Sequence, residues 1–292
     1  IIETTLYKFQ IDKTIPTIET VKQTLDEAIK KEKIQSKVDT KTLSEKERIK
    51  NMSLFEFFDH HLKTAQIKHS TYKGYNTTKN SLEEYQTAKN IKLSFKNIDI
   101  DFYNSYVVFL QKKGLSKNTI GQRIKIIKAI LREAHDRDIE VCKDYTKKSF
   151  KRISETADTI YLNESELKQL YNKKDFPAYL ERTRDLFLVG CYTGLRVSDY
   201  SRLKKEHITK DGKITITTQK TGQKVVIPMH NIVKEIFKKY NFNFPKPPTG
   251  QVFNRFLKEM GELAELNEVV CTEITKGGLK VTKNTPKHDL IT

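Results

Sequence analysis

The stretch Thr193-Gly194-Leu195-Arg196-Val197-Ser198-Asp199 places a turn and two charged groups directly after an apolar run. That run, Leu186 to Tyr192, predicts a buried helix, and Gly194 provides the backbone freedom for a turn into the next helix. Arg196 and Asp199 are spaced so that both should lie on one side of that helix. A guanidinium held by a carboxylate is suited to grip a phosphate, and the alternative is a structural Arg–Asp pair that closes the turn.

A predicted β-hairpin follows this turn along the chain. Lys213 to Thr217 alternates as a strand does, and Val225 to Ile227 predicts the partner strand, which Pro228 ends. The residues between the strands, Gln219 to Lys224, include a glycine and should form the hairpin tip. Lys220 lies on this tip, where a lysine is usually only a solvated surface charge.

The arginine turn and the hairpin lysine together resemble the tyrosine recombinases, or phage integrases. Within that family the likeness is greatest to integrases of conjugative transposons from Bacteroides-type bacteria. Lys220 follows the arginine turn at the distance, and in the Lys-Thr context, that the family shows. The resemblance implies a mainly α fold with a small β component (α+β), in which a helical core-binding domain precedes a mixed α/β catalytic domain. Further segments that carry it are Gly114–Ile120, Ile160–Leu167, Arg184–Phe187 and Phe244–Pro247.

The resemblance also implies a chemistry. A tyrosine hydroxyl attacks the scissile phosphate of DNA and gives a 3′-phosphotyrosine link and a free 5′-hydroxyl. Arg196 matches the family's first catalytic arginine, Asp199 its supporting acidic residue, and Lys220 the general acid toward the leaving oxygen. No metal or other cofactor is expected, because basic groups neutralise the charge on phosphorus. The implied function is integration or excision of a mobile element at double-stranded DNA attachment sites, by a full-length protein that forms a tetramer on paired sites.

The second half of the family's active site has no match in residues 1–292. The family places a His-x-x-Arg motif and then the nucleophilic tyrosine after the hairpin. His288-Asp289-Leu290-Ile291 resembles one form of that motif, but Ile291 stands in the arginine's place. We therefore expect His288 to be a surface residue that precedes the true motif, and the chain to be cut short of it and inactive alone. The alternatives are a non-catalytic DNA-binding regulator or decayed integrase relative, and a basic helical scaffold that binds RNA or a protein.

Helical periodicity and charge divide the chain into four parts. The first carries an amphipathic helix, Ile18 to Lys31, with Thr17 as its cap, and the second carries four helices. The resemblance to the tyrosine recombinases implies what these parts are: an N-terminal arm-type segment or linker (1–50), a helical core DNA-binding domain (51–145), an exposed basic linker (146–159) and a truncated catalytic domain (160–292).

The last helix of the second part has both an apolar and a basic face. Ile120, Ile124, Ile127, Leu131 and Ala134 repeat at steps of three and four, which predicts a buried stripe. A basic flank beside it can lie against DNA phosphates, and a merely solvated face is the alternative. The expected DNA-contacting residues in this part and the linker are Lys117, Asn118, Lys125, Lys128, Arg132, Lys148 and Lys151.

The composition agrees with a polyanionic partner. The chain of 292 residues has a formal net charge of +17, from 54 Lys and Arg against 37 Asp and Glu. Its three cysteines are far apart and form no zinc-binding pattern, which suits the reducing cytoplasm of a bacterium. No apolar stretch reaches membrane-spanning length.

Overall fold

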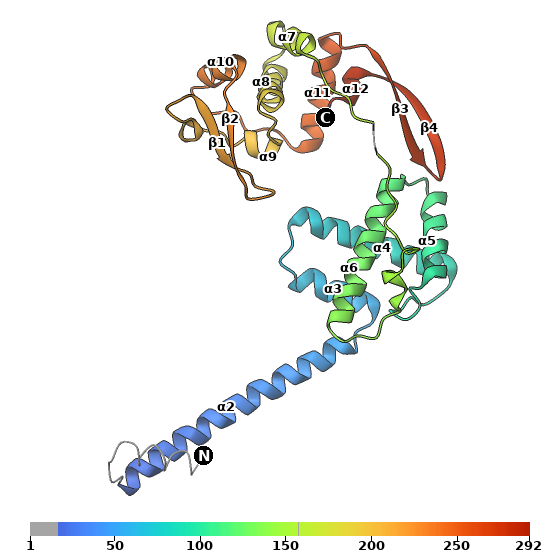
Figure 1. Ribbon diagram of the computed structural model, residues 1–292, viewed down its shortest axis with the longest axis vertical. Helices are drawn as coiled ribbons and strands as arrows, with labels where there is room; N and C mark the ends of the chain where they lie inside the picture. The colour runs from blue at the N-terminus through green and yellow to red at the C-terminus, as the bar shows by residue number, and fades with distance from the viewer. Residues whose placement is uncertain (1–16, 157) are drawn as a thin grey trace. The chain divides into compact units, whose positions relative to one another are not determined.

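The computed structural model describes residues 17–156 and 158–292, except for the side chains of residues 32–44 (Figure 1). The first sixteen residues of the expected arm-type segment therefore lie outside the description. The chain divides into two compact units, which we call the helical unit (1–155 with 275–279) and the mixed unit (156–274 with 280–292). In the part of the chain that is described, no helix has both the length and the apolar composition that a membrane span needs.

The helical unit contains the four helices predicted from periodicity and one longer helix before them. Ser53 caps α3 with a full capping box, and Asp99 caps α5 through the N–H of Phe102. Thr17 caps α2 as predicted, but that helix continues to Lys50, because no Gly or Pro interrupts it. The elements are α2 (Ile18–Lys50), α3 (Leu54–Thr64), α4 (His69–Lys89), α5 (Ile100–Lys112), α6 (Lys117–Asp136) and the 3-10 helix η1 (Lys143–Thr146).

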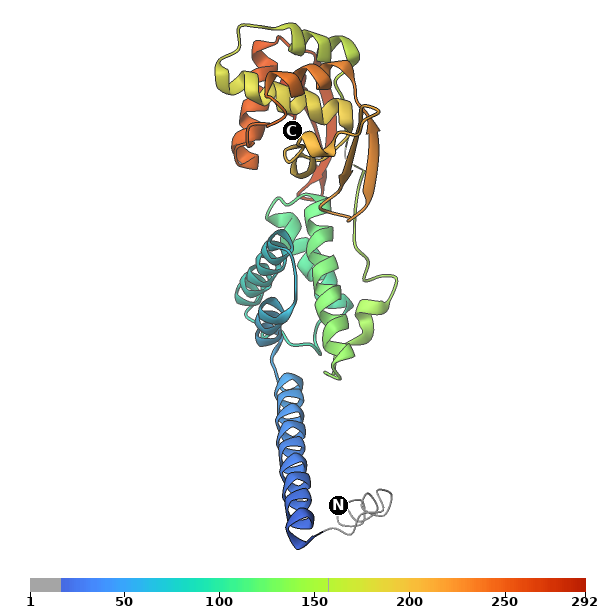
Figure 2. The same cartoon turned by 90° about the vertical axis from the view of Figure 1, so that its left-hand side faces the viewer.

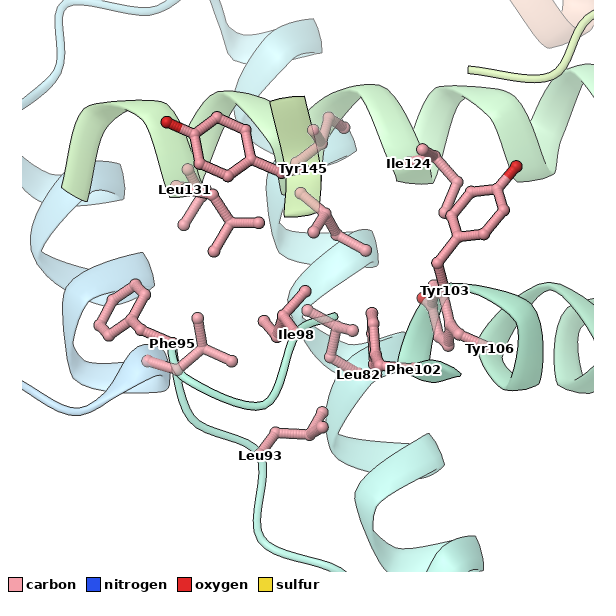
Figure 3. Packing of buried hydrophobic residues seen from close by; sticks show 14 of the residues in the cluster. Leu82, Leu93, Phe95, Ile98, Phe102, Tyr103, Tyr106, Ile124, Leu131 and Tyr145 are labelled. Atoms are coloured by element: carbon pink, nitrogen blue, oxygen red, sulfur yellow. The ribbon is translucent and has the colours of Figure 1, made fainter. Parts of the chain in front are cut away.

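The apolar face of α6 forms one side of the helical unit's core. All five residues of the predicted stripe are at most 1 % exposed, which confirms the periodicity. Figure 3 shows Ile124 and Leu131 of α6 among side chains from the preceding segments, including Leu82, Ile98 and Phe102. Burial of this stripe fixes α6 in place and leaves Lys125 and Arg132 exposed on another side of the helix.

The segment that follows η1 packs onto the helical unit, so the expectation of an exposed linker over 146–159 is wrong for its first half. Phe150 is wholly buried in the core. The Tyr103 hydroxyl donates to the carbonyl of Lys151 at 3.0 Å. The carbonyl of Ile153 lies so near Gly121 that a Cβ there would be 1.8 Å from its oxygen. Phe150 and the partly buried Ile153 supply the apolar contacts that hold this largely polar segment on the core.

The mixed unit is built around α8, which contacts α7, α9, α10 and α11 (Figure 1, and the turned view in Figure 2). Two small two-stranded sheets, β1–β2 and β3–β4, complete the fold, so the predicted mainly α class with a small β component is confirmed. The elements are α7 (Glu164–Asn172), α8 (Ala178–Thr193), α9 (Val197–Tyr200), η2 (Lys205–His207), β1 (Lys213–Thr217), β2 (Lys224–Pro228), α10 (Asn231–Lys239), α11 (Gly250–Leu263), β3 (Val269–Lys276), β4 (Leu279–Pro286) and α12 (Lys287–Leu290).

The short helix α12 packs against α11, and His288 is not the surface residue that the sequence suggested. His288 is half-buried, and a Cβ added at Gly261 would lie 2.8 Å from its own Cβ. The N–H of His288 donates to the carbonyl of Leu266 at 3.0 Å. Ile291 is only 4 % exposed and belongs to the core of the mixed unit. An apolar residue at this position therefore serves packing, which an arginine there would disrupt.

Candidate active site

The turn between α8 and α9 presents Arg196 to solvent. Gly194 ends α8 in the left-handed conformation, with φ of 65°, as the sequence predicted. Arg196 is the N-cap of α9, and its carbonyl accepts hydrogen bonds from the N–H groups of Asp199 and Tyr200 at 2.7 and 2.9 Å. The backbone of the turn is therefore satisfied without the arginine side chain, which is exposed.

Close packing holds α9 against α8. Tyr200 is 4 % exposed and lies over Gly190, where an added Cβ would be 2.7 Å from the tyrosine ring. Burial raises the pKa of the Tyr200 hydroxyl far above its ordinary value. The role of Tyr200 in this site is to fix the position of the turn.

Asp199 does not pair with Arg196, which corrects the prediction made from their spacing. The carboxylate of Asp199 is wholly buried, and its Oδ1 accepts from the N–H of Gln219 at 2.8 Å and from Arg202 at 3.3 Å. The reason is local geometry. Arg196 has extended backbone angles (φ −72°, ψ 154°) as the N-cap, so the helical rule for residues three apart does not apply to it.

Arg202 is the residue of this site that the sequence reasoning missed. Its Nη2 donates both to Oδ1 of Asp199 and to the carbonyl of Thr217, the last residue of β1. Asp199 and Arg202 are also three residues apart, but Arg202 lies beyond the end of α9, so the helical rule does not predict this ion pair either. The contact with Thr217 could not be read from spacing, since it joins two segments of the fold.

The hairpin after this contact presents Lys220. β1 and β2 pair antiparallel with Ile214 opposite Ile227 and Thr217 opposite Lys224. The tip is closed by hydrogen bonds from the N–H of Thr218 to the carbonyl of Gln223 and from the N–H of Gly222 to the carbonyl of Thr218, both at 2.9 Å. Gly222 has φ of 68°, which a glycine adopts without strain. Lys220 is exposed on this tip.

Arg196 and Lys220 are both available to a ligand. Neither side chain makes a hydrogen bond or an ion pair with any described residue. The two segments that carry them are joined by the hydrogen bond from Gln219 to Asp199. A planar guanidinium fork and an ammonium group are each suited to bind a phosphate oxygen, and here they lie on segments joined by a hydrogen bond. Over residues 17–156 and 158–292, no cluster of His, Cys, Asp or Glu side chains could hold a metal ion.

Two of the predicted DNA-contacting residues of the helical unit are bonded to the protein's own backbone. Asn118 donates to the carbonyl of Glu155 and accepts from its N–H, both at 3.0 Å. Lys128 donates to the carbonyl of Phe150 at 2.8 Å and lies 5.9 Å from the centre of that ring. Burial, with the neighbouring charge of Arg132, lowers the pKa of Lys128 below its ordinary value. Both side chains hold the segment after η1.

The other predicted DNA-contacting residues of the helical unit are not used in this way. Lys117 is half-buried at the start of α6, and the other four are exposed. Their side chains make no hydrogen bond or ion pair inside the described ranges, so their charges are free for phosphates. The four exposed residues are Lys125, Arg132, Lys148 and Lys151.

Comparison with known protein families identifies two integrase domains in the chain. The phage integrase SAM-like domain matches residues 53–153, and the phage integrase family matches residues 160–270. The chain belongs to the phage integrase family of tyrosine recombinases. Site-specific recombination is therefore the function of this integrase, and the matched ranges include α6 in the first domain and both Arg196 and Lys220 in the second.

Solved structures show the same fold in other integrases. A lambda integrase tetramer bound to a Holliday junction is similar at a TM-score of 0.56 and 18 % identity, over 75 % of this chain and 68 % of that one. The Tn1549 transposon integrase in complex with circular intermediate DNA is similar at a TM-score of 0.52 and 16 % identity, over 73 % of this chain and 80 % of that one. The XerH site-specific recombinase bound to a palindromic difH substrate is similar at a TM-score of 0.52 and 16 % identity, over 68 % of this chain and 64 % of that one. Among curated proteins, no sequence matches this integrase.

Proposed function

We propose that this integrase inserts or excises a mobile element by cutting and rejoining double-stranded DNA at attachment sites. The carrying observation is that Arg196 and Lys220 are exposed and unpaired on two segments that Asp199 bonds together. The similar lambda and Tn1549 integrases were solved on a Holliday junction and on circular intermediate DNA, which supports DNA as the substrate. The net charge of +17 agrees with it.

Arg196 is proposed to bind the two non-bridging oxygens of the scissile phosphate. All five N–H donors of its guanidinium are unused by the described part of the protein, and their planar arrangement matches two phosphate oxygens. Negative charge on these oxygens grows as the nucleophile approaches phosphorus. A fixed cation at this position therefore stabilises the transition state more than the ground state.

Lys220 is proposed to protonate the leaving 5′-oxygen. In the cleavage step the tyrosine hydroxyl releases its proton to solvent, a bond forms between the tyrosine oxygen and phosphorus, and the bond from phosphorus to the 5′-oxygen breaks. The proton that Lys220 donates moves to that oxygen and gives a neutral 5′-hydroxyl. Asp199 supports this arrangement through the backbone of Gln219 and touches no reacting atom.

The second arginine motif and the nucleophilic tyrosine have no match in residues 1–292. We propose that sequence outside these residues supplies them, and that the chain alone binds DNA without cleaving it. We also propose that the complete protein acts as a tetramer on paired sites in the bacterial cytoplasm, and that it is most like the conjugative-transposon integrases of Bacteroides-type bacteria. A DNA-binding regulator derived from an integrase is the second candidate, because it needs neither of the missing motifs.

The test uses the recombinase that carries this chain together with its nucleophilic tyrosine. On ordinary DNA, Arg196→Ala should lower the cleavage rate by about 10³- to 10⁵-fold and Lys220→Ala by about 10²- to 10⁴-fold. A substrate with sulfur in place of the 5′-bridging oxygen has a leaving group that needs no proton. It should restore cleavage to Lys220→Ala but not to Arg196→Ala.

The control is Lys210→Ala, which removes an exposed lysine of the same unit and should cleave as the parent does. Equal restoration of both variants, or of neither, contradicts the general-acid role of Lys220. A parent protein that binds the site and never forms a covalent adduct would favour the regulator.

A further inference from the structure

One guanidinium group joins the arginine turn to the lysine hairpin. Nη2 of Arg202 lies 3.3 Å from Oδ1 of Asp199 and also donates to the carbonyl of Thr217. The Asp199 side chain is wholly buried, whereas that of Arg202 is 35 % exposed. A buried carboxylate that loses its cation is strongly unfavourable, so this contact fixes both segments.

These bonds hold two of the three residues that precede Lys220. The carbonyl of Thr217 is held by Arg202, and the N–H of Gln219 is held by Asp199 at 2.8 Å. Lys220 is the next residue, and no described group bonds its side chain. The direction in which the lysine leaves the hairpin follows from its backbone, which is held by the hydrogen bonds that close the tip and, directly before Lys220, by the Arg202–Asp199 pair.

Asp199 and Arg202 share a single hydrogen-bonded contact among the described residues. Oδ2 of Asp199 and Nε of Arg202 are both buried, and neither has a hydrogen-bond partner among the described residues. The connection thus depends on a single carboxylate oxygen and a single guanidinium nitrogen. Removing the guanidinium should release the hairpin tip. It should not open β1 itself, because Ile214 and Ile216 of that strand are buried in the core of the mixed unit.

We infer that Arg202 is a positioning residue for Lys220, acting through Asp199 and Thr217 and not through the phosphate. The inference rests on the proposed role of Lys220 as general acid. If Arg202 positions Lys220, its variants should cleave slowly only where the leaving oxygen needs a proton. If Arg202 contacted the phosphate, its variants should cleave slowly on ordinary DNA and on the sulfur substrate alike. Two measurements separate these cases.

The first measurement is hydrogen exchange on residues 1–292 and does not depend on catalysis. In Arg202→Gln the amide of Gln219 should exchange at least about tenfold faster, because its acceptor is no longer held, while those of Ile214 and Ile216 stay protected. Arg202→Lys keeps the charge and should give a smaller increase in the exchange rate of the Gln219 amide. This variant provides the test if Arg202→Gln does not fold. The control, Lys224→Gln, removes an exposed charge of the same hairpin and should change nothing. Unchanged exchange at Gln219 in both Arg202 variants overturns the inference.

The second measurement is cleavage by the recombinase that carries the nucleophile. Arg202→Gln should cleave ordinary DNA about 10- to 100-fold more slowly and recover on the substrate with 5′-bridging sulfur. Added to Lys220→Ala, it should cost nothing further on ordinary DNA. A defect that sulfur does not relieve, or a double variant slower than Lys220→Ala, shows that Arg202 contacts the phosphate and overturns the inference. If sulfur fails to restore Lys220→Ala itself, the proposed function of that lysine fails, and faster exchange at Gln219 would then show only a structural link.

Discussion

The helical unit and the mixed unit use their candidate DNA-facing groups differently. In the helical unit, two of the seven candidates, Asn118 and Lys128, bond backbone groups of the segment after η1, at Glu155 and Phe150, and the other five are unpaired within the described ranges. In the mixed unit, by contrast, the candidate groups are unpaired and other side chains hold the backbone. The comparison shows that a basic or amide side chain that bonds a neighbouring loop, as Asn118 and Lys128 do, has fewer donors left for DNA.

The physical cause is the same in both units. Residues 151–156 have no regular secondary structure, so their carbonyl and N–H groups must find other partners. Side chains of α5 and α6 provide these partners in the helical unit. The end of β1 has the same need, and Arg202 and Asp199 meet it. Arg196 and Lys220 remain free because their own turns are closed by backbone hydrogen bonds.

The largest expected effect tests whether the segment after η1 is part of the helical core. Phe150→Ala removes a fully buried ring and should lower the free energy of unfolding by about 3–5 kcal/mol. Chemical denaturation followed by circular dichroism measures this. The control is Lys148→Ala, an exposed neighbour that should stay within about 0.5 kcal/mol of the parent. A loss below about 1 kcal/mol for Phe150→Ala would mean that the segment is a free linker in solution.

The second test compares two arginines of the mixed unit. Arg184 is 6 % exposed and bonds both Asp185 and the carbonyl of Lys173, at 2.9 and 2.7 Å. Arg184→Ala should cost about 3 kcal/mol, the low end for a broken buried pair, because Asp185 keeps its bond to Lys239. Arg196→Ala should change the unfolding free energy by less than about 0.5 kcal/mol. Similar losses in the two variants would show that Arg196 also has a structural role.

The smallest effect concerns α6. Affinity for duplex DNA should fall steeply with salt, and Lys125→Ala should reduce the slope of log affinity against log salt concentration by about 1. Lys128→Ala should reduce it by less, because the Lys128 ammonium is already bonded to Phe150. A salt series on both variants measures the difference. Equal slopes would show that Lys128 leaves its carbonyl partner to bind DNA.

Local features of the fold were determined by the sequence alone. The buried stripe of α6, the left-handed turn at Gly194 and the hairpin that carries Lys220 all follow from residues a few positions apart. Side-chain periodicity, glycine at a positive φ and strand alternation each act within one or two turns of chain. Arg196 and Lys220 each lie on such a local feature, but their candidate roles came from the resemblance to tyrosine recombinases and stay predictions.

Only the tertiary structure decided which groups meet across the fold. Asp199 bonds Gln219 twenty residues away, Asn118 bonds Glu155 across thirty-seven, and His288 packs on Gly261. No spacing rule predicts such partners, because they depend on how whole helices and strands pack. A buried polar group must bond whichever donor or acceptor the packing brings to it. In this integrase that requirement, more than residue type, decides which charged side chains are bonded within the protein and which are left free for DNA.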